Sequence, residues 1–162
     1  MKTSLRQTCW LLLMTLMLSH CALRQVDVKD EVRDPAEQTD SVIQITPMAP
    51  EAVQLLINEA DEHLQQGQHE EALLTLKRAL NISPQSALVQ QNLAEVYLAD
   101  GQYQQAFSWS RQVVSQGPSF GPLCERARRT LALAAEMLAD VETQAKALGG
   151  IAGCSQQQAP RF

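Results

Sequence analysis

Apolar side chains recur at helical spacing through most of the chain after residue 50. Val53, Leu56, Ala60 and Leu64 fall three or four positions apart, with polar residues between them. That spacing predicts an amphipathic helix with one buried face. The pattern returns further along, so residues 51–150 are predicted to be a series of such helices; the later apolar stripes are Leu73, Leu76 and Leu80, then Leu123, Ala127, Leu131, Ala134 and Leu138.

Two stretches within this region match each other. Residues 59–84 read EADEHLQQGQHEEALLTLKRALNISP, and residues 93–118 read LAEVYLADGQYQQAFSWSRQVVSQGP. Glycine, alanine and proline coincide at a fixed period of 34 residues: Gly67 with Gly101, Ala72 with Ala106, and Pro84 with Pro118. This period, with these residue types at the turn, at the close helix contact and at the end of the unit, resembles the tetratricopeptide repeat.

The resemblance implies an all-α fold, a short solenoid of about three helical hairpins. One hairpin cannot bury its apolar stripe alone, and stacking of about three is needed. We expect repeats at about residues 53–86 and 87–120, and a degenerate capping hairpin at 121–150 whose turn lacks the glycine and aromatic pair. In that hairpin, Asp140 is expected to cap a short helix over about 141–148.

The N-terminus has the pattern of a signal peptide, predicted over residues 1–20. Lys2 and Arg6 precede the apolar run 10–18, which is too short to span a membrane. The following Leu18-Ser19-His20-Cys21 resembles the bacterial lipobox, with His20 as a departure, and implies a lipid (palmitate among its acyl chains) on Cys21. Ordinary signal-peptidase cleavage after Cys21 is the alternative. Ala22 after the cysteine implies the outer membrane, with the protein on its periplasmic face.

Residues 21–50 are predicted to be a lipidated cysteine followed by a flexible tether. Charges and prolines are mixed there without a sustained helical period. The short apolar piece at residues 42–45 is expected to dock or to stay disordered, because no second strand is available for it. Residues 151–162 are expected to form a C-terminal tail.

The cysteines predict one disulfide. Cys9 leaves with the signal and Cys21 is linked to lipid, so Cys124 and Cys154 remain as a pair in an oxidising compartment. Two free thiols are the alternative.

Charge and chemistry exclude other classes of function. Without Lys2 and Arg6, 11 basic side chains face 18 acidic ones, so nucleic acid is not an expected partner. His63 and His69 are six positions apart, which suits neither a helical metal pair nor a catalytic triad. We expect no enzymatic activity, no metal, no small-molecule substrate and no cofactor besides the lipid on Cys21.

In tetratricopeptide proteins the first helices of successive repeats line a groove that holds partner segments. Chaperone-binding members carry Lys and Asn where this chain has Ile57 and Asp61, so that activity is not expected. Arg126, Arg128 and Arg129 suit either a partner-binding basic patch or a solvated helix face. The groove residues that the resemblance implies are Gln54, Ile57, Asp61, Leu64, Leu88, Gln91, Asn92, Glu95, Leu98, Arg126, Arg129 and Leu133.

Three functions are compatible with this pattern. The first is a non-catalytic adaptor of the cell envelope, similar to small tetratricopeptide lipoproteins that activate class A penicillin-binding proteins, the bifunctional peptidoglycan synthases. The second is an assembly lipoprotein of a type IV pilus or secretion system, although such proteins commonly have longer repeat arrays. The third is a general scaffold or chaperone-like lipoprotein. In each case the expected partner is a periplasmic or inner-membrane protein.

Overall fold

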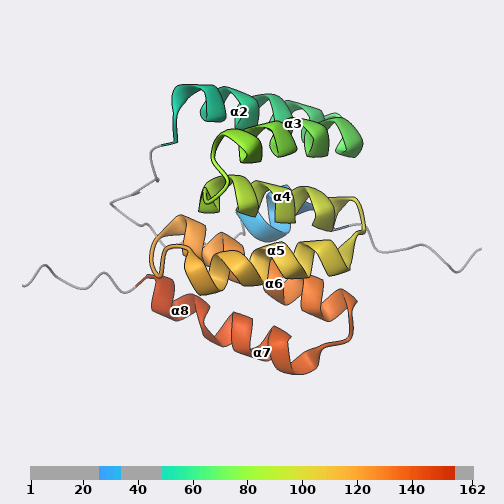
Figure 1. The fold of residues 1–162 in the computed structure, drawn as a ribbon. Coiled ribbons are helices and arrows are strands. Elements are labelled where there is room, and N and C mark those ends of the chain that lie inside the picture. The colour runs from blue at the N-terminus through green and yellow to red at the C-terminus, as the bar shows by residue number, and fades with distance from the viewer. Residues whose placement is uncertain (1–25, 34–48, 156–162) are drawn as a thin grey trace, which may run out of the picture.

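The computed structural model describes residues 26–33 and 49–155, and the structure of these ranges is helical without strands (Figure 1). Successive helices form hairpins that stack from α2 and α3 at one end to α7 at the other (Figure 1). The predicted all-α solenoid of three hairpins is confirmed. The hairpins are α2 (Glu51–Gln65) with α3 (His69–Ile82), α4 (Ala87–Ala99) with α5 (Tyr103–Gln116), and α6 (Pro122–Met137) with α7 (Val141–Gly149), followed by α8 (Ile151–Cys154).

The three hairpin turns share one backbone geometry. Gly67 and Gly101 have φ of 72° and 74°, in the left-handed region that glycine enters at little cost. Ala139 takes the same place in the third turn, with φ of 58°. After each of these residues the next N–H closes the turn on a carbonyl five residues back: Gln68 on His63 (2.9 Å), Gln102 on Tyr97 (2.8 Å) and Asp140 on Ala135 (2.8 Å).

Small residues stand where the helices of the first two hairpins approach most closely. Ala60 and Ala94 on the first helices, and Ala72 and Ala106 on the second helices, are at most 2 % exposed. A larger side chain at these positions would push the helices apart, because protein interiors are close-packed. The repeated alanines therefore set the helix spacing, and leucines such as Leu76 and Leu93 fill the space between the hairpins.

The third hairpin is closed by a disulfide between Cys124 of α6 and Cys154 of α8, whose Cα atoms are 5.7 Å apart. The predicted disulfide is confirmed. The N–H of Gly121, just before α6, also donates to the carbonyl of Cys154 (2.9 Å). Asp140 caps α7 by accepting from the N–H of Thr143 (3.0 Å), as its sequence position predicts.

An N-terminal segment, residues 26–33, lies against the middle of the stack and ends in the helical turn η2 (Lys29–Arg33), drawn in blue beside α4 in Figure 1. We call these residues the docked segment. The prediction of a flexible tether over residues 21–50 is wrong for this part of it. The reason is local: a helical turn here presents buried valines to the stack.

Other predictions concern residues outside the described ranges. These are the signal peptide over residues 1–20, lipidation of Cys21, docking or disorder of residues 42–45, and the end of the C-terminal tail. Among the residues that are described, no helix has both the length and the apolar character needed to cross a membrane.

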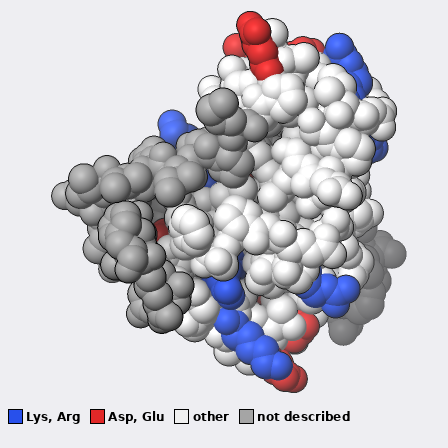
Figure 2. All heavy atoms as spheres, turned by 60° about the vertical axis from the view of Figure 1, so that its left-hand side comes forward, with Lys and Arg blue, Asp and Glu red and all other residues white. Residues whose placement is uncertain are grey.

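The surface shown in Figure 2 has few charges in its middle. Where no grey atoms cover it, most of the visible Lys, Arg, Asp and Glu side chains lie toward the upper and lower parts of the stack. The charged side chain of α4, Glu95, is completely buried, and Arg126 and Arg129 of α6 are mostly buried.

Candidate functional site

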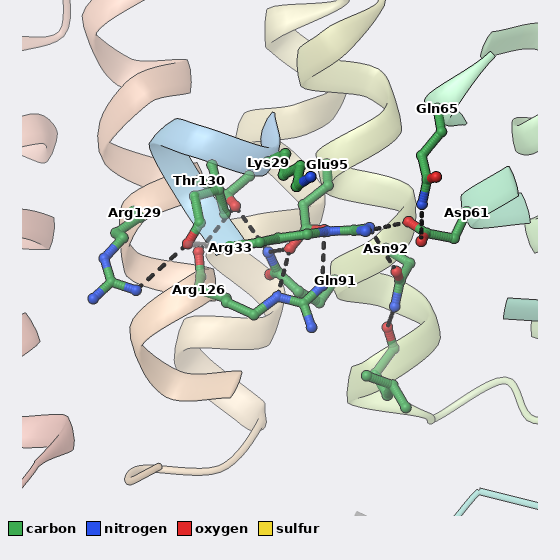
Figure 3. A network of polar contacts seen from close by, with 12 residues as sticks. Lys29, Arg33, Asp61, Gln65, Gln91, Asn92, Glu95, Arg126, Arg129 and Thr130 are labelled. Atoms are coloured by element: carbon green, nitrogen blue, oxygen red, sulfur yellow. Dashed lines mark hydrogen bonds and ion pairs between the residues drawn. The ribbon is translucent and has the colours of Figure 1, made fainter. Parts of the chain in front are cut away.

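The candidate site is the surface formed by the first helices of the three hairpins, α2, α4 and α6, which we call the groove. The docked segment lies on it, so the groove of this chain holds a piece of the same chain (Figure 3).

The docked segment is shaped by one capping residue, Asp27. Its carboxylate accepts from the backbone N–H of Lys29 (2.9 Å), and its carbonyl accepts from the N–H of Glu31 (2.8 Å). The Glu31 carboxylate in turn accepts from the N–H of Asp27 (3.2 Å). This reciprocal capping starts a helical turn, and it places Val28 and Val32 four positions apart on one face.

Three valines fix the docked segment to the groove. Val26, Val28 and Val32 are 3 %, 5 % and 0 % exposed. Full burial of a valine side chain contributes on the order of 1.5 kcal/mol or more, so the three together give a moderate apolar anchor. The valines pack in one cluster with Leu98, Ala106 and Ala134, edged by Tyr97, Ala99, Tyr103, Phe107 and Leu133.

The guanidinium of Arg33 provides the polar anchor. Its Nε donates to Glu95 Oε2 (2.6 Å), its Nη2 donates to Asn92 Oδ1 (3.1 Å), and its Nη1 is bonded to Asp61 Oδ1. Asp61 belongs to α2, and the other two acceptors belong to α4, as Figure 3 shows. One side chain therefore bridges the first and second hairpins.

Glu95 is the centre of this polar network. It also accepts two bonds from the guanidinium of Arg126 (2.9 and 2.8 Å) and one from the Gln91 amide (2.9 Å). Burial acts to raise the pKa of Glu95, but Arg126 and Arg33 outweigh burial and lower it to about 2. Glu95 is therefore a buried carboxylate that stays ionised, held between two cations.

The same network acts on Arg33. Burial acts to lower the pKa of its guanidinium, but the charges of Glu95 and Asp61 and their hydrogen bonds outweigh burial and raise that pKa above its usual value. Arg33 is thus held as a cation by carboxylates from two helices.

Arg126 and Arg129 do not form an open basic patch. Arg126 is bonded to Glu95, while Arg129 is paired with Glu125 (2.8 Å) and donates to the carbonyl of Val32 (3.4 Å) at the end of the docked segment. The sequence predicts either a partner-binding basic patch or a solvated helix face here, and neither describes these two arginines. They position and cap the groove's occupant.

The structure brings most of the predicted groove residues together. Those that surround the docked segment or hold its contacts are Asp61, Gln91, Asn92, Glu95, Leu98, Arg126, Arg129 and Leu133. Three others do not meet it: Ile57 and Leu88 are buried in the core of the first two hairpins, and Gln54 is exposed and bonded to Asn58. Partner binding at these residues stays a prediction.

A cleft of about 840 Å³ continues the groove beside the docked segment. Leu64, Gln65 and His69 of the first hairpin lie on one side of it, and Val26 and Lys29 of the docked segment on another. Leu64, predicted as a groove residue, therefore lines this cleft and not the valine cluster.

Sequence reasoning missed the docked segment, although a signal for it exists. Asp27 followed by Asp30 and Glu31 is a helix-start pattern, and Val28 and Val32 share a face at helical spacing. A single turn is too short to give a helical period, so the sequence pattern predicts a tether over these residues.

The groove binds one guanidinium, that of Arg33, next to the three buried valines of the docked segment. In the described residues, no group of three or more His, Cys, Asp or Glu side chains could hold a metal ion. Nε, Nη1 and Nη2 of Arg33 are each bonded to a carboxylate or amide oxygen, and this arrangement orients the guanidinium.

Comparison with known proteins adds one match. A protein-family model of the TPR (tetratricopeptide) repeat matches residues 60–101, which run from the middle of α2 through α3 and α4 to the second turn. No curated protein matches the chain. The match covers Gly67, Ala72, Pro84 and Gly101 of the predicted repeat, so the chain contains a TPR repeat, built into an all-α solenoid.

Proposed function

We propose that this protein is a non-catalytic adaptor whose groove binds a short segment of a partner protein. The TPR repeat suggests a role in protein–protein interaction. The observation that carries the proposal is the docked segment itself, because its backbone turn, three valines and one arginine all find complementary partners on α2, α4, α5 and α6. A surface that accommodates one such segment has the chemistry to accommodate another.

The proposal extends to the place where the adaptor works. The lipobox-like sequence ending at Cys21 supports a lipid-anchored protein on the periplasmic face of the outer membrane. The disulfide supports an oxidising compartment. Within the envelope we propose a class A penicillin-binding protein as the client, by similarity to small tetratricopeptide lipoproteins that activate these synthases.

Site-specific crosslinking in intact envelopes tests the binding surface. A photoreactive amino acid at Gln65, exposed on α2 and lining the cleft, is expected to capture the partner. The same group at Lys77, exposed on α3, is the matched control and is expected to capture none. Adducts from Lys77 alone would move the binding surface away from the groove.

The captured protein, identified by mass spectrometry, separates the clients. A peptidoglycan synthase supports the proposed role, whereas a pilus or secretin subunit assigns the adaptor to the assembly of that machine. Intact-mass measurement of membrane-extracted protein tests the anchor. The expected mature chain begins at a lipidated Cys21, and any other first residue contradicts the anchor.

A further inference from the structure

The groove of this protein is already occupied by the chain's own residues 26–33. We propose that the docked segment is an intramolecular competitor, and that a partner enters the groove by replacing it with a segment that carries aliphatic side chains and an arginine. The inference rests on the proposed function, since it names the partner's chemistry and adds a control on access.

The docked segment owes its order to the groove. A single helical turn is unstable by itself in water, because nucleation of a helix fixes several dihedral angles for one hydrogen bond. The buried faces of Val28 and Val32 and the ion pairs of Arg33 supply what the turn lacks. Loss of these few contacts therefore releases the whole segment, while the hairpins keep their own core.

The receiving site is built without the docked segment. Glu95 is held by Arg126 and by Gln91, and the Gln91 amide is held in turn by the hydroxyl of Thr130 (2.8 Å). These residues all belong to α4 and α6. The acceptor for the cation thus stays in place when Arg33 leaves, and it does not have to be assembled by the partner.

The charge of the site calls for one cation from its occupant. The carboxylates of Asp61 and Glu95 face one fixed cation, Arg126, which leaves a net charge of −1 for the occupant to neutralise. Three acceptors on three residues receive three different nitrogens of Arg33. A planar guanidinium can make this set of bonds and the single nitrogen of lysine cannot, so the site selects arginine.

Tethering makes the docked segment an effective competitor. A segment joined to its site through residues 34–48 is present at an effective concentration on the order of millimolar. The observed affinity for an external segment equals the affinity of the open groove multiplied by the fraction of molecules whose groove is open. A groove that is open one-tenth of the time therefore binds about tenfold more weakly.

A peptide with the sequence of residues 26–33, VDVKDEVR, carrying a fluorophore, is the probe. Its affinity is measured by anisotropy for three forms of the full chain in detergent: the wild type, the double variant Val28→Asp, Val32→Asp, and the control Asp30→Asn at an exposed position of the same turn. A single cooperative thermal transition in each of the three forms confirms that the hairpins remain folded, and the double variant is expected to melt at a lower temperature because it lacks the bound segment.

The double variant is expected to bind the peptide at least about tenfold more tightly than the wild type and the control. Equal affinity of all three forms would overturn the competitor and leave the adaptor proposal standing. Absence of binding to the double variant would count against the groove as a binding site and so against the proposed function as well.

Two further measurements complete the test. A peptide with lysine in place of its arginine is expected to bind the double variant at least about tenfold more weakly, and equal binding would overturn the selection for a guanidinium. Sedimentation of the wild type is expected to show a monomer at all concentrations. A concentration-dependent dimer, lost in the double variant, would instead place the segment in the groove of a second copy.

Discussion

Arg33 and Glu95 are 62 positions apart in the chain, yet the Nε of the first lies 2.6 Å from the Oε2 of the second. This ion pair joins the docked segment to the middle of the solenoid. Glu95 is completely buried, whereas Arg33 retains partial exposure. The carboxylate is therefore the permanent part of the site and the arginine is the part that can leave.

Glu95 is expected to be important for stability as well as for recognition. The change Glu95→Gln leaves Arg126 and Arg33 without their buried carboxylate, and breaking a buried pair in this way costs about 3 kcal/mol of unfolding free energy. Urea denaturation at neutral pH measures this loss. The change Glu59→Gln is the control, because the exposed Glu59–Arg78 pair contributes less than about 1 kcal/mol. Equal losses in both variants would contradict the role of Glu95.

The pH dependence of stability should also report on Glu95. Its pKa is lowered to about 2 in the folded protein from an ordinary value of 4.5. Because the folded-state value is the lower one, this contribution is fully present above the ordinary pKa and is lost as pH falls from about 4.5 toward 2. It amounts to about 3 kcal/mol. Urea denaturation at several pH values between 7 and 2 measures this loss, and the unfolding free energy is expected to fall less with decreasing pH in Glu95→Gln than in the wild type. The same fall in both proteins would contradict the prediction.

The third turn offers a stabilising substitution. Ala139 holds the left-handed conformation that Gly67 and Gly101 hold in the other turns. Replacing this alanine by glycine relieves the backbone strain, which raises the unfolding free energy by about 1–2 kcal/mol. The greater freedom of glycine in the unfolded chain lowers the unfolding free energy by about 0.4–1 kcal/mol. Ala139→Gly should therefore raise the unfolding free energy by up to about 1.6 kcal/mol. Gly101→Ala should lower it, and a gain from both changes would refute the argument.

Reduction of the disulfide is expected to weaken the last hairpin. The bond closes a sequence separation of 30 residues. In the chain-entropy model, closing such a loop is worth about 3 to 4 kcal/mol. Denaturation with and without reductant measures the difference, and the double variant Cys124→Ser, Cys154→Ser should behave like the reduced protein and no longer respond to reductant. Two reactive thiols in the unreduced, unfolded protein would show that the bond is absent.

The fold could be predicted because its determinants are local and repeated. Gly67 and Gly101 mark turns that only a few residue types adopt, and the alanines between them mark close helix contacts. The apolar stripe predicts the third hairpin although Ala139 stands in place of the glycine, because Asp140 is an N-cap residue and marks the start of the next helix.

The candidate site could be predicted only in part. The helical period assigns Asp61, Asn92 and Glu95 to the first helices, but it does not indicate what they bind. Their partner, Arg33, lies in a single turn outside the repeats, and its pairing depends on tertiary contacts between distant parts of the chain. The same period predicts groove positions for Ile57 and Leu88, which also lie on first helices, yet packing between the hairpins buries them in the core.

The position of the docked segment sets how far the solenoid can stand from its proposed anchor. Val26 is five positions after Cys21, and a chain of that length spans at most about 18 Å. With the segment docked, a lipid on Cys21 would hold the groove close to the membrane surface. With the segment released, the next described residue is Ala49, 28 positions after Cys21, and the maximum span of a chain of that length is about 100 Å. If a partner's arginine replaced Arg33 in the groove, the distance that the solenoid can reach from the membrane would therefore increase.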